Sequence, residues 1–313
     1  MRIGVVGAGG VGGYLGARLA QAGHEVVFIA RGDHLRAIQA HGLQVHSPAG
    51  TFTVQPARAT DDPRAAGPVE IALVAVKAWQ TPQVAETMRP LVGDTTTVAP
   101  LLNGVEAPTQ LATVLGAERV VGGLCHVICY IEAPGVIRHV GGVPDVAFGE
   151  MDGSHTPRIE QLIAVFERAS IRAIISDDIQ AALWQKLLFV EGVGAVGAIS
   201  RAPLGVIRSV PEARQLVEMV MRETCVVANA RGATLGERDV ADALRLLDNM
   251  PTDGTASMQR DIRDSRPSEL DAQTGAVMRL GHAVGVATPL HDMLYAALLP
   301  QELRARGKLQ FAS

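Results

Sequence analysis

The sequence predicts an α/β fold in its first part and an all-helical fold in its second, and three observations carry this prediction. Up to residue 176, short β-rich runs alternate with helical stretches, which is typical of βαβ units around a parallel sheet. The run at residues 71–76 is apolar throughout, as in a strand that is buried on both faces. From residue 177 onward the strand signal fades, and glycine and proline separate long helical stretches.

The elements follow from this pattern in chain order. In the first predicted domain, residues 1–176, we expect strands at 2–7, 25–30, 71–76 and 95–102 and helices at 11–23, 33–42 and 79–92. Shorter runs with turns at 134–135 and 141–142 predict added antiparallel strands between residues 120 and 150. Ser154 is expected to cap a helix at 155–169, before a last strand at 172–176. The second predicted domain, residues 177–313, is expected to hold helices at 177–200, 211–232, 237–250 and 268–285.

The composition is that of an ordinary soluble protein and excludes several classes of function. The 313 residues carry a formal net charge of −4, so no basic surface for nucleic acid or a membrane is expected. No run of 18 apolar residues occurs, so no transmembrane helix is expected. Three cysteines, an odd number, argue against a disulfide framework and favour a cytoplasmic protein. The sequence sets no oligomeric state, and a homodimer is left open.

No metal site is expected either. Cys125, His126 and Cys129 are close in sequence, but they lie in an apolar run typical of a buried strand. No second pair of ligands follows them, as a zinc site would require.

The glycine-rich segment at residues 7–12 has the pattern G-x-G-x-x-G, and it lies between a predicted strand and a predicted helix. This context is that of a dinucleotide-binding, Rossmann-type domain. The first glycine permits a tight turn, the second lets the backbone approach a pyrophosphate, and the third allows close helix–strand packing. The residues expected to bind the cofactor are Gly7, Gly9, Gly10, Val11 and Gly12. A glycine-rich turn without a ligand is the weaker alternative.

The residue after the second strand, Arg31, indicates whether the cofactor is NAD or NADP. Sites for NAD usually end the second strand with a carboxylate that binds the ribose 2′-hydroxyl, whereas this strand is followed by Arg31. A guanidinium can pair with a 2′-phosphate, so NADP is favoured over NAD. Arg31 as a plain surface charge is the alternative, and the nearby Asp33 keeps NAD open.

Only three of the 28 basic residues are lysines, namely Lys77, Lys186 and Lys308, so each lysine in an apolar context is a candidate for chemistry. Lys77 ends the strand at 71–76, at the edge of a parallel sheet where ligands bind, although it could simply be solvated there. Asn103 ends the next strand run and could offer its amide at the same edge.

Lys186 lies within a helix between apolar neighbours. It either extends its ammonium to water or is placed to donate a proton, and the sequence leaves both open. Hydride reduction of a carbonyl produces an alkoxide, which needs such a donor. Lys308 is expected to be a solvated charge.

The chain resembles the ketopantoate reductases (2-dehydropantoate 2-reductases) over essentially its whole length. The matching pieces are GAGGVG with Arg31, VKAWQT around Lys77, LLNGVE around Asn103, LWQKL around Lys186 and SMQRDIRDSRPSELD at 257–271. The last piece is the most specific, because a generic dinucleotide fold does not carry it.

The resemblance implies a role for each matching residue. Lys186 is implied to be the general acid, and Glu269 to orient that lysine and the substrate. Asn103 and Lys77 are implied to bridge NADP and the substrate, a small 2-keto acid, and Ser257 to contact the substrate carboxylate. From the residues alone, Glu269 could instead be a carboxylate in the first turn of a helix, and Ser257 an ordinary cap or turn hydroxyl.

Three positions depart from the family pattern. Asparagines are common in this family four and eight residues after the lysine, where this chain has Val190 and Gly194, and a third asparagine position is occupied by Leu204. Glu191 has no counterpart in the family pattern. Losing amides removes hydrogen-bond donors, which can change substrate discrimination by large factors. Glycines at 192, 194 and 197 would equally allow two helices to approach closely.

The sequence therefore predicts the NADPH-dependent reduction of 2-dehydropantoate to pantoate, a step towards pantothenate. The departures at Val190 and Gly194 support an alternative in which another 2-keto acid is the substrate. A non-catalytic NADP-binding sensor is the third hypothesis, and the presence of both Lys186 and Glu269 argues against it.

Overall fold

The structure, a computed structural model, describes residues 1–311 and divides into two compact units. The first unit comprises Met1–Leu102 and Glu106–Ile179, and the second comprises Asn103–Val105 and the chain from Gln180 onward. The last two residues of the predicted domain 177–313 lie outside the described residues. The predicted α/β class, with a helical second part, is confirmed.

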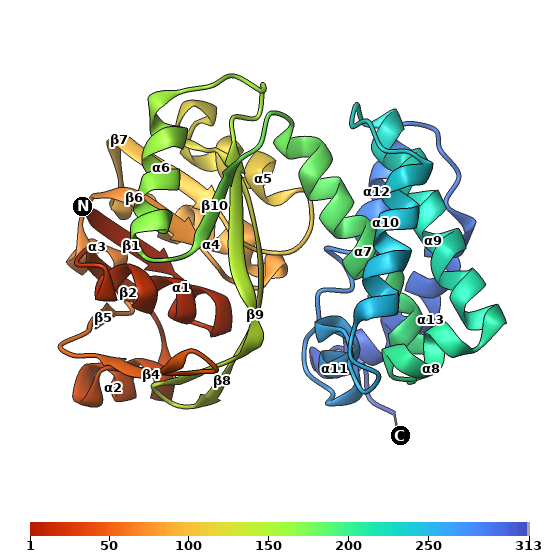
Figure 1. The fold of residues 1–313 in the computed structure, drawn as a ribbon, viewed down its shortest axis with the longest axis horizontal. Helices are drawn as coiled ribbons and strands as arrows, with labels where there is room; N and C mark the ends of the chain where they lie inside the picture. Colours follow the sequence, from red (N-terminus) through yellow and green to blue (C-terminus); the bar gives the residue numbers. More distant parts are fainter. Residues whose placement is uncertain (312–313) are drawn as a thin grey trace. The chain divides into compact units, whose positions relative to one another are not determined.

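A five-stranded parallel sheet forms the centre of the first unit (Figure 1). Its strand order is β5-β2-β1-β6-β7, with β5 at Arg58–Thr60, β2 at Glu25–Ile29, β1 at Arg2–Val6, β6 at Val69–Val74 and β7 at Val92–Pro100. Because the chain proceeds from β1 to one side of the sheet and later returns to the other, a topological switch point lies between β1 and β6. Ligands bind at such points, beyond the carboxyl ends of the strands.

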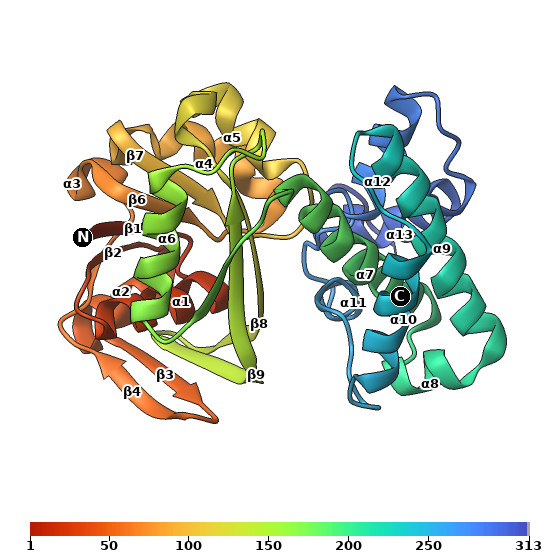
Figure 2. The same cartoon turned by 45° about the horizontal axis from the view of Figure 1, so that its top comes forward.

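A second sheet is built mainly from the long strands β8, Gly122–Ala133, and β9, Val136–Gly149, which pair antiparallel (Figure 2). Strand β9 also pairs in parallel with β10, Arg172–Ile175, and with β3, Leu43–Ser47, which forms a hairpin with β4, Gly50–Val54. The strands β3, β4 and β5 were not expected from the sequence.

Helix α1, Gly10–Gln21, packs against strands of both sheets, and two glycines make this possible. A Cβ at Gly16 would lie 2.5 Å from the ring of Phe28 in one sheet, and a Cβ at Gly13 would lie 2.8 Å from Ile137 in the other. The remaining helices of the unit are α2 at Gly32–His41, α3 at Pro63–Ala66, α4 at Thr81–Thr87, α5 at Ala107–Leu115 and α6 at Pro157–Arg168, with short 3₁₀ turns at Ala78–Gln80, Arg89–Leu91 and Ala117–Arg119.

Two local predictions for this unit are wrong. The glycine pair at 141–142 forms no turn, because it lies inside β9, where the register with β8 shifts near Gly141. Ser154 does not cap α6, because its hydroxyl donates to Asp152 instead, at 2.7 Å. The residue at the N-cap of α6 is Thr156.

The second unit consists of helices around one apolar core. The helices are α7 at Ile179–Ser200, α8 at Leu204–Ser209, α9 at Pro211–Ala230, α10 at Glu237–Asn249, α11 at Ser257–Arg263, α12 at Thr274–Ala283 and α13 at Pro289–Ala305. Helix α9 packs against α8, α10, α12 and α13 (Figure 1). The predicted helix at 268–285 is shorter than expected, because residues before Thr274 form a turn.

Helix α7 is long and apolar enough to cross a membrane by length and composition alone, although polar residues such as Lys186 and Glu191 interrupt its apolar sequence. However, 67% of its most apolar window is buried inside the structure, as in the core helix of a soluble protein. Its glycines explain part of this burial. A Cβ at Gly192 would lie 2.9 Å from Met221 of α9, and one at Gly197 would lie 2.7 Å from Gln259 of α11. Glycine therefore allows close helix contact here.

Candidate functional site

The glycine-rich loop joins β1 to α1 and is shaped for close backbone approach. Gly7 has a φ of +95°, and a Cβ there would lie 2.7 Å from the side chain of Val76, which follows β6. A Cβ at Gly12 would overlap the carbonyl oxygen of Gly7. At Gly9, in contrast, a Cβ would meet no atom within 4 Å, so open space remains beside the start of the helix. This is where a pyrophosphate binds in folds of this type.

A groove of about 690 Å³ borders this loop, a volume suited to a dinucleotide half. Gly7, Ala8 and Gly9 form one wall, and Arg31 and His34 lie at the end of β2 and the start of α2. The residues present therefore fit the dinucleotide predicted from the sequence.

Arg31 is exposed, and its guanidinium has no hydrogen bond or ion pair within residues 1–311. A second exposed arginine, Arg64 on α3, lines the same groove. Its guanidinium likewise has no hydrogen bond or ion pair in the described part of the chain, whereas its backbone N–H donates to Asp62. Arg64 was not a candidate from the sequence, since it follows β5, a strand that the sequence pattern does not reveal.

The two loop glycines lead to opposite expectations for alanine variants. Gly9→Ala should leave the melting temperature unchanged but weaken NADPH binding by at least tenfold, because the added methyl group enters the open space beside the loop. Gly12→Ala should lower the melting temperature by several degrees, because its methyl group overlaps backbone. Thermal unfolding and fluorescence titration with NADPH measure both effects, and a Gly9→Ala protein that binds NADPH normally would contradict the assignment.

Lys77 lies at the carboxyl side of β6, as expected, and begins a short 3₁₀ turn. Its backbone N–H donates to Gln80 Oε1 at 3.2 Å, which fixes the chain direction after the strand. The side chain is half-buried. Val76 and Gln80, on either side of it, line the groove.

Asn103 and Glu269 come together within the second unit. The Asn103 side-chain amide donates to Glu269 Oε2 at 2.9 Å, although the two residues are 166 positions apart. The turn holding Asn103 is fixed by Gly104, which has a φ of +95° and packs against the carbonyl of Ala272. Two residues that the sequence singled out separately thus form one polar pair.

Glu269 is not in the first turn of a helix, contrary to the alternative weighed from sequence. It lies in a turn before α12, where its carbonyl accepts from the N–H groups of Ala272 and Gln273. Its side chain is only 4% exposed. The Gln273 amide also donates to Glu269 Oε2, at 3.4 Å. Gln273 was missed from the sequence, although its position four residues after Glu269 could have pointed to it.

Lys186 lies in the first half of α7, and its side chain is half-buried beside the fully buried Leu187. Ser257 is the first residue of α11 and is also half-buried.

The three departures from the family pattern have structural consequences. A Cβ at Gly194 would lie 3.2 Å from Met258 Cε, so the thioether occupies the space that a longer side chain would need. The loss of an amide therefore leaves Met258 in part of this space, while Gln273 Oε1 would lie 3.6 Å from the same Cβ. Leu204 is 2% exposed and belongs to the core of the unit, and Val190 is half-buried.

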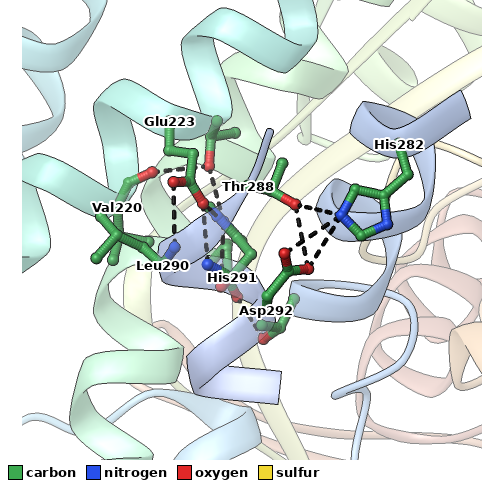
Figure 3. A network of polar contacts seen from close by, with 10 residues as sticks. Val220, Glu223, His282, Thr288, Leu290, His291 and Asp292 are labelled. Carbon is green, nitrogen blue, oxygen red and sulfur yellow. Dashed lines mark hydrogen bonds and ion pairs between the residues drawn. The ribbon is translucent and has the colours of Figure 1, made fainter. Parts of the chain in front are cut away.

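Glu191 takes part in a buried cluster of polar side chains. Its side chain is fully buried and accepts from the Thr274 hydroxyl at 3.0 Å, and Glu191 Oε1 lies 3.5 Å from His291 Nε2. His291 Nδ1 lies 2.6 Å from Glu223 Oε1 on α9. Figure 3 shows Glu223 also accepting from the backbone N–H groups of Leu290 and His291, at the start of α13.

The two carboxyls in this cluster differ in their environment. Burial raises the pKa of Glu191, and the opposing effects of His291 and of the Thr274 hydroxyl are smaller. Burial also acts to raise the pKa of Glu223, but the hydrogen bonds from His291 and Leu290 outweigh it and hold that pKa below its usual range. Glu223 is thus a carboxylate that holds α13 to α9.

Leucine substitutions should separate these two carboxyls. Glu223→Leu should lower the free energy of unfolding by about 3–5 kcal/mol, because it leaves buried donors of α13 without an acceptor. Glu191→Leu should change it by less than about 1 kcal/mol or increase it, because His291 keeps Glu223 as its partner.

The pH dependence gives a second check of this difference. A carboxyl with a raised pKa in the folded state binds its proton more tightly when folded, so the folded state loses stability as the pH rises above 4.5. Urea unfolding between pH 4 and pH 8 should therefore show wild type losing stability relative to Glu191→Leu. Equal losses for the two leucine variants would contradict the assignment.

Cys125, Cys129 and Cys225 form no disulfide. Burial raises the pKa of Cys225 to about 11 and also raises that of Cys129, so neither is an activated nucleophile. Within residues 1–311, no group of three His, Cys, Asp or Glu side chains is arranged to hold a metal ion.

Comparisons with known proteins show which family the chain belongs to, and they agree with the dinucleotide groove described above. The sequence models described as "Ketopantoate reductase PanE/ApbA" and "Ketopantoate reductase PanE/ApbA C terminal" match residues 3–153 and 178–302. A 2-dehydropantoate 2-reductase of Mesorhizobium japonicum is 32% identical, over 95% of this chain and 96% of the relative. The uncharacterized oxidoreductase YkpB of Bacillus subtilis is 30% identical, over 95% and 98%.

A solved structure of a 2-dehydropantoate 2-reductase from Geobacter metallireducens has a TM-score of 0.90 and is 34% identical, over 96% of this chain and 99% of that one. The resemblance stated from the motifs, the oxidoreductase class and the expectation of NADP as cofactor are thereby confirmed at the level of the family. The chain belongs to the ketopantoate reductase family of NADPH-dependent oxidoreductases.

Proposed function

We propose that this protein reduces 2-dehydropantoate to pantoate with NADPH. The observation that carries the proposal is the hydrogen bond between Asn103 and Glu269, which unites two family motifs from distant parts of the chain. A buried carboxylate held by two side-chain amides offers a fixed acceptor for a hydroxyl group or an ammonium group.

In this proposal each residue has a defined task. NADPH, when bound along the glycine-rich loop and Arg31, supplies the hydride for the keto carbon. Lys186 donates the proton that the developing alkoxide needs. Glu269 and Asn103 hold the substrate.

Two further residues complete the proposed site. Ser257 binds the substrate carboxylate, and Lys77 contacts cofactor and substrate at the end of β6.

A second candidate keeps the chemistry and changes the substrate to another 2-keto acid. Val190 and Gly194 replace amide side chains, and Met258 fills the space beside Gly194. The loss of two amide side chains favours a 2-keto acid that lacks the hydroxyl group of 2-dehydropantoate. The sensor hypothesis is set aside, because the chain belongs to a family of oxidoreductases.

The test is NADPH oxidation with 2-dehydropantoate beside a panel of linear, branched and aromatic 2-keto acids. We expect the highest kcat/KM with 2-dehydropantoate. Turnover of another panel member with negligible turnover of 2-dehydropantoate would overturn the named substrate and favour the second candidate. Absence of NADPH oxidation with every acid would overturn the reductase itself.

We also propose that the protein acts in the cytoplasm on a small 2-keto acid. Three free cysteines and a net charge of −4 support this location and this class of partner.

A further inference from the structure

His34 occupies an unusual position in the cofactor groove, because its imidazole joins two separate segments. It lies in the first turn of α2, three residues after Arg31. Its Nε2 lies 2.8 Å from the carbonyl oxygen of Ala8, in the middle of the glycine-rich loop. Its Nδ1 accepts the backbone N–H of Gly135, in the turn between β8 and β9, at 3.0 Å.

These two partners leave only one form of the ring. A backbone N–H can only donate, so Nδ1 must carry a lone pair, and a carbonyl oxygen can only accept, so Nε2 must carry the proton. His34 is therefore a neutral imidazole in the Nε2–H tautomer. Burial agrees with this form, since it lowers the pKa of His34, and the hydrogen bond to Ala8 offsets only part of the effect.

The contact with Ala8 fixes a peptide plane of the loop. The N–H groups of Gly7 and Ala8 donate to the carbonyl of Ile29, at 3.1 and 3.3 Å, so the loop is already held to β2 on one side. The Ala8 carbonyl shares a rigid trans peptide with the N–H of Gly9, and the two point in opposite directions. Holding the carbonyl at His34 therefore also sets the direction of the Gly9 N–H, at the N-terminus of α1, where phosphates bind.

The contact with Gly135 fixes the opposite wall of the groove. Gly135 has a φ of +76°, and its carbonyl accepts from Gln44 of β3 at 2.9 Å. Further along the hairpin, Ile131 lines the groove with His34. A Cβ at Gly10 would overlap the carbonyl of Cys129, so β8 passes directly over the first turn of α1.

We infer that His34 is a positioning residue for the dinucleotide: its hydrogen bond to Ala8 orients the phosphate-binding loop, and its bond to Gly135 holds the hairpin that borders the same groove. The inference rests on the cofactor site proposed above.

Two conservative variants separate the two bonds. Glutamine places an amide nitrogen close to the position of Nε2, so His34→Gln keeps a donor for Ala8. Asparagine places an amide oxygen close to the position of Nδ1, so His34→Asn keeps an acceptor for Gly135. The orienting role passes through Ala8, and we therefore expect His34→Gln to restore NADPH binding and His34→Asn not to do so.

The experiment is a fluorescence titration of the full-length protein with NADPH, with thermal unfolding of each variant beside it. His34→Ala and His34→Asn should raise the dissociation constant about tenfold, as expected for the loss of one or two buried hydrogen bonds, and His34→Gln should raise it less than threefold. The KM for NADPH should rise in parallel while kcat stays within twofold. His41→Ala, at the exposed far end of α2, is the matched control and should bind NADPH as wild type does.

The possible outcomes are distinct from those of the proposed function. If wild type does not bind NADPH, the cofactor site itself is wrong. If wild type binds NADPH and the dissociation constant of His34→Ala is within twofold of the wild-type value, the inference is overturned. It is also overturned if His34→Asn and His34→Gln have equal dissociation constants for NADPH. A ¹⁵N nuclear magnetic resonance spectrum at pH 7.5 adds a direct check, because a protonated Nδ1 on His34 would contradict the tautomer.

Discussion

Lys186→Ala should lower kcat by roughly 10²–10⁴, the usual contribution of a general acid. Reduction of a 2-keto acid leaves negative charge on the former carbonyl oxygen, and without a positioned donor the proton must come from water. Lys186→Arg should not restore the rate, because a guanidinium stays protonated near neutral pH. Steady-state rates at saturating NADPH and 2-keto acid measure the effect.

Two controls make this prediction specific. Lys308→Ala removes an exposed lysine near the C-terminus and should leave kcat unchanged. The dissociation constant for NADPH should be unaffected by Lys186→Ala, since the glycine-rich loop and Arg31 belong to the other unit. A kcat for Lys186→Ala within tenfold of the wild-type value would contradict the proposal that Lys186 is the general acid.

Arg31→Ala should weaken NADPH binding by about 10–100-fold and leave NADH binding within about twofold. The expected size is that of a charge-assisted hydrogen bond to a phosphate. The guanidinium has no partner within residues 1–311 and lines the groove at the end of β2, so it is available to a 2′-phosphate. Titration of one protein preparation with both cofactors gives the ratio directly.

The matched control for Arg31 is Arg36, which lies on the same helix and pairs with Asp33. Arg36→Ala should alter neither dissociation constant by more than about twofold. Equal weakening of NADPH and NADH by Arg31→Ala would show that Arg31 does not discriminate the cofactors. Loss of discrimination only in Arg64→Ala would transfer the role to that second arginine.

Sequence patterns were sufficient for the parts of the fold with strong periodicity. The strands β1, β2 and β6 are short, mostly apolar runs with glycine, arginine or lysine within three residues of their ends, and buried parallel strands have this appearance. The hairpin β3–β4 was not predicted, because each strand has only five residues with two apolar side chains, Leu43 and Val45 in β3 and Phe52 and Val54 in β4, and so short a pattern is a weak signal. The sequence predicts helix from residue 268, because helical spacing continues through Glu269, but α12 begins at Thr274 after a turn.

Most residues of the candidate site could also be predicted from the sequence, and others could not. Residues within recognisable motifs, such as Lys186 and Asn103, could be found without a structure. Gln273 could have been noticed from its spacing of four residues after Glu269. His34 could not, since its partners lie far from it along the chain: Ala8 through its carbonyl and Gly135 through its N–H. Such long-range hydrogen bonds leave no local pattern in the sequence.

Glu191 shows why a departure from a family pattern needs a structure to interpret it. From sequence its position beside Val190 left its role open. Its side chain is fully buried against Thr274 and His291, so it belongs to a cluster that joins α7, α13 and the start of α12. The change at Glu191 is therefore one of internal packing and charge.

Transfer of an isotope label tests directly whether hydride passes from NADPH to the keto carbon of a 2-keto acid. The enzyme is incubated with NADPH that carries deuterium at both C4 positions of the nicotinamide and with the panel acid that it turns over fastest. We predict that the 2-hydroxy acid product contains one deuterium, at C2, and that Lys186→Ala forms the same labelled product at a much lower rate. A product without deuterium at C2, or no labelled product from any acid in the panel, would contradict the account.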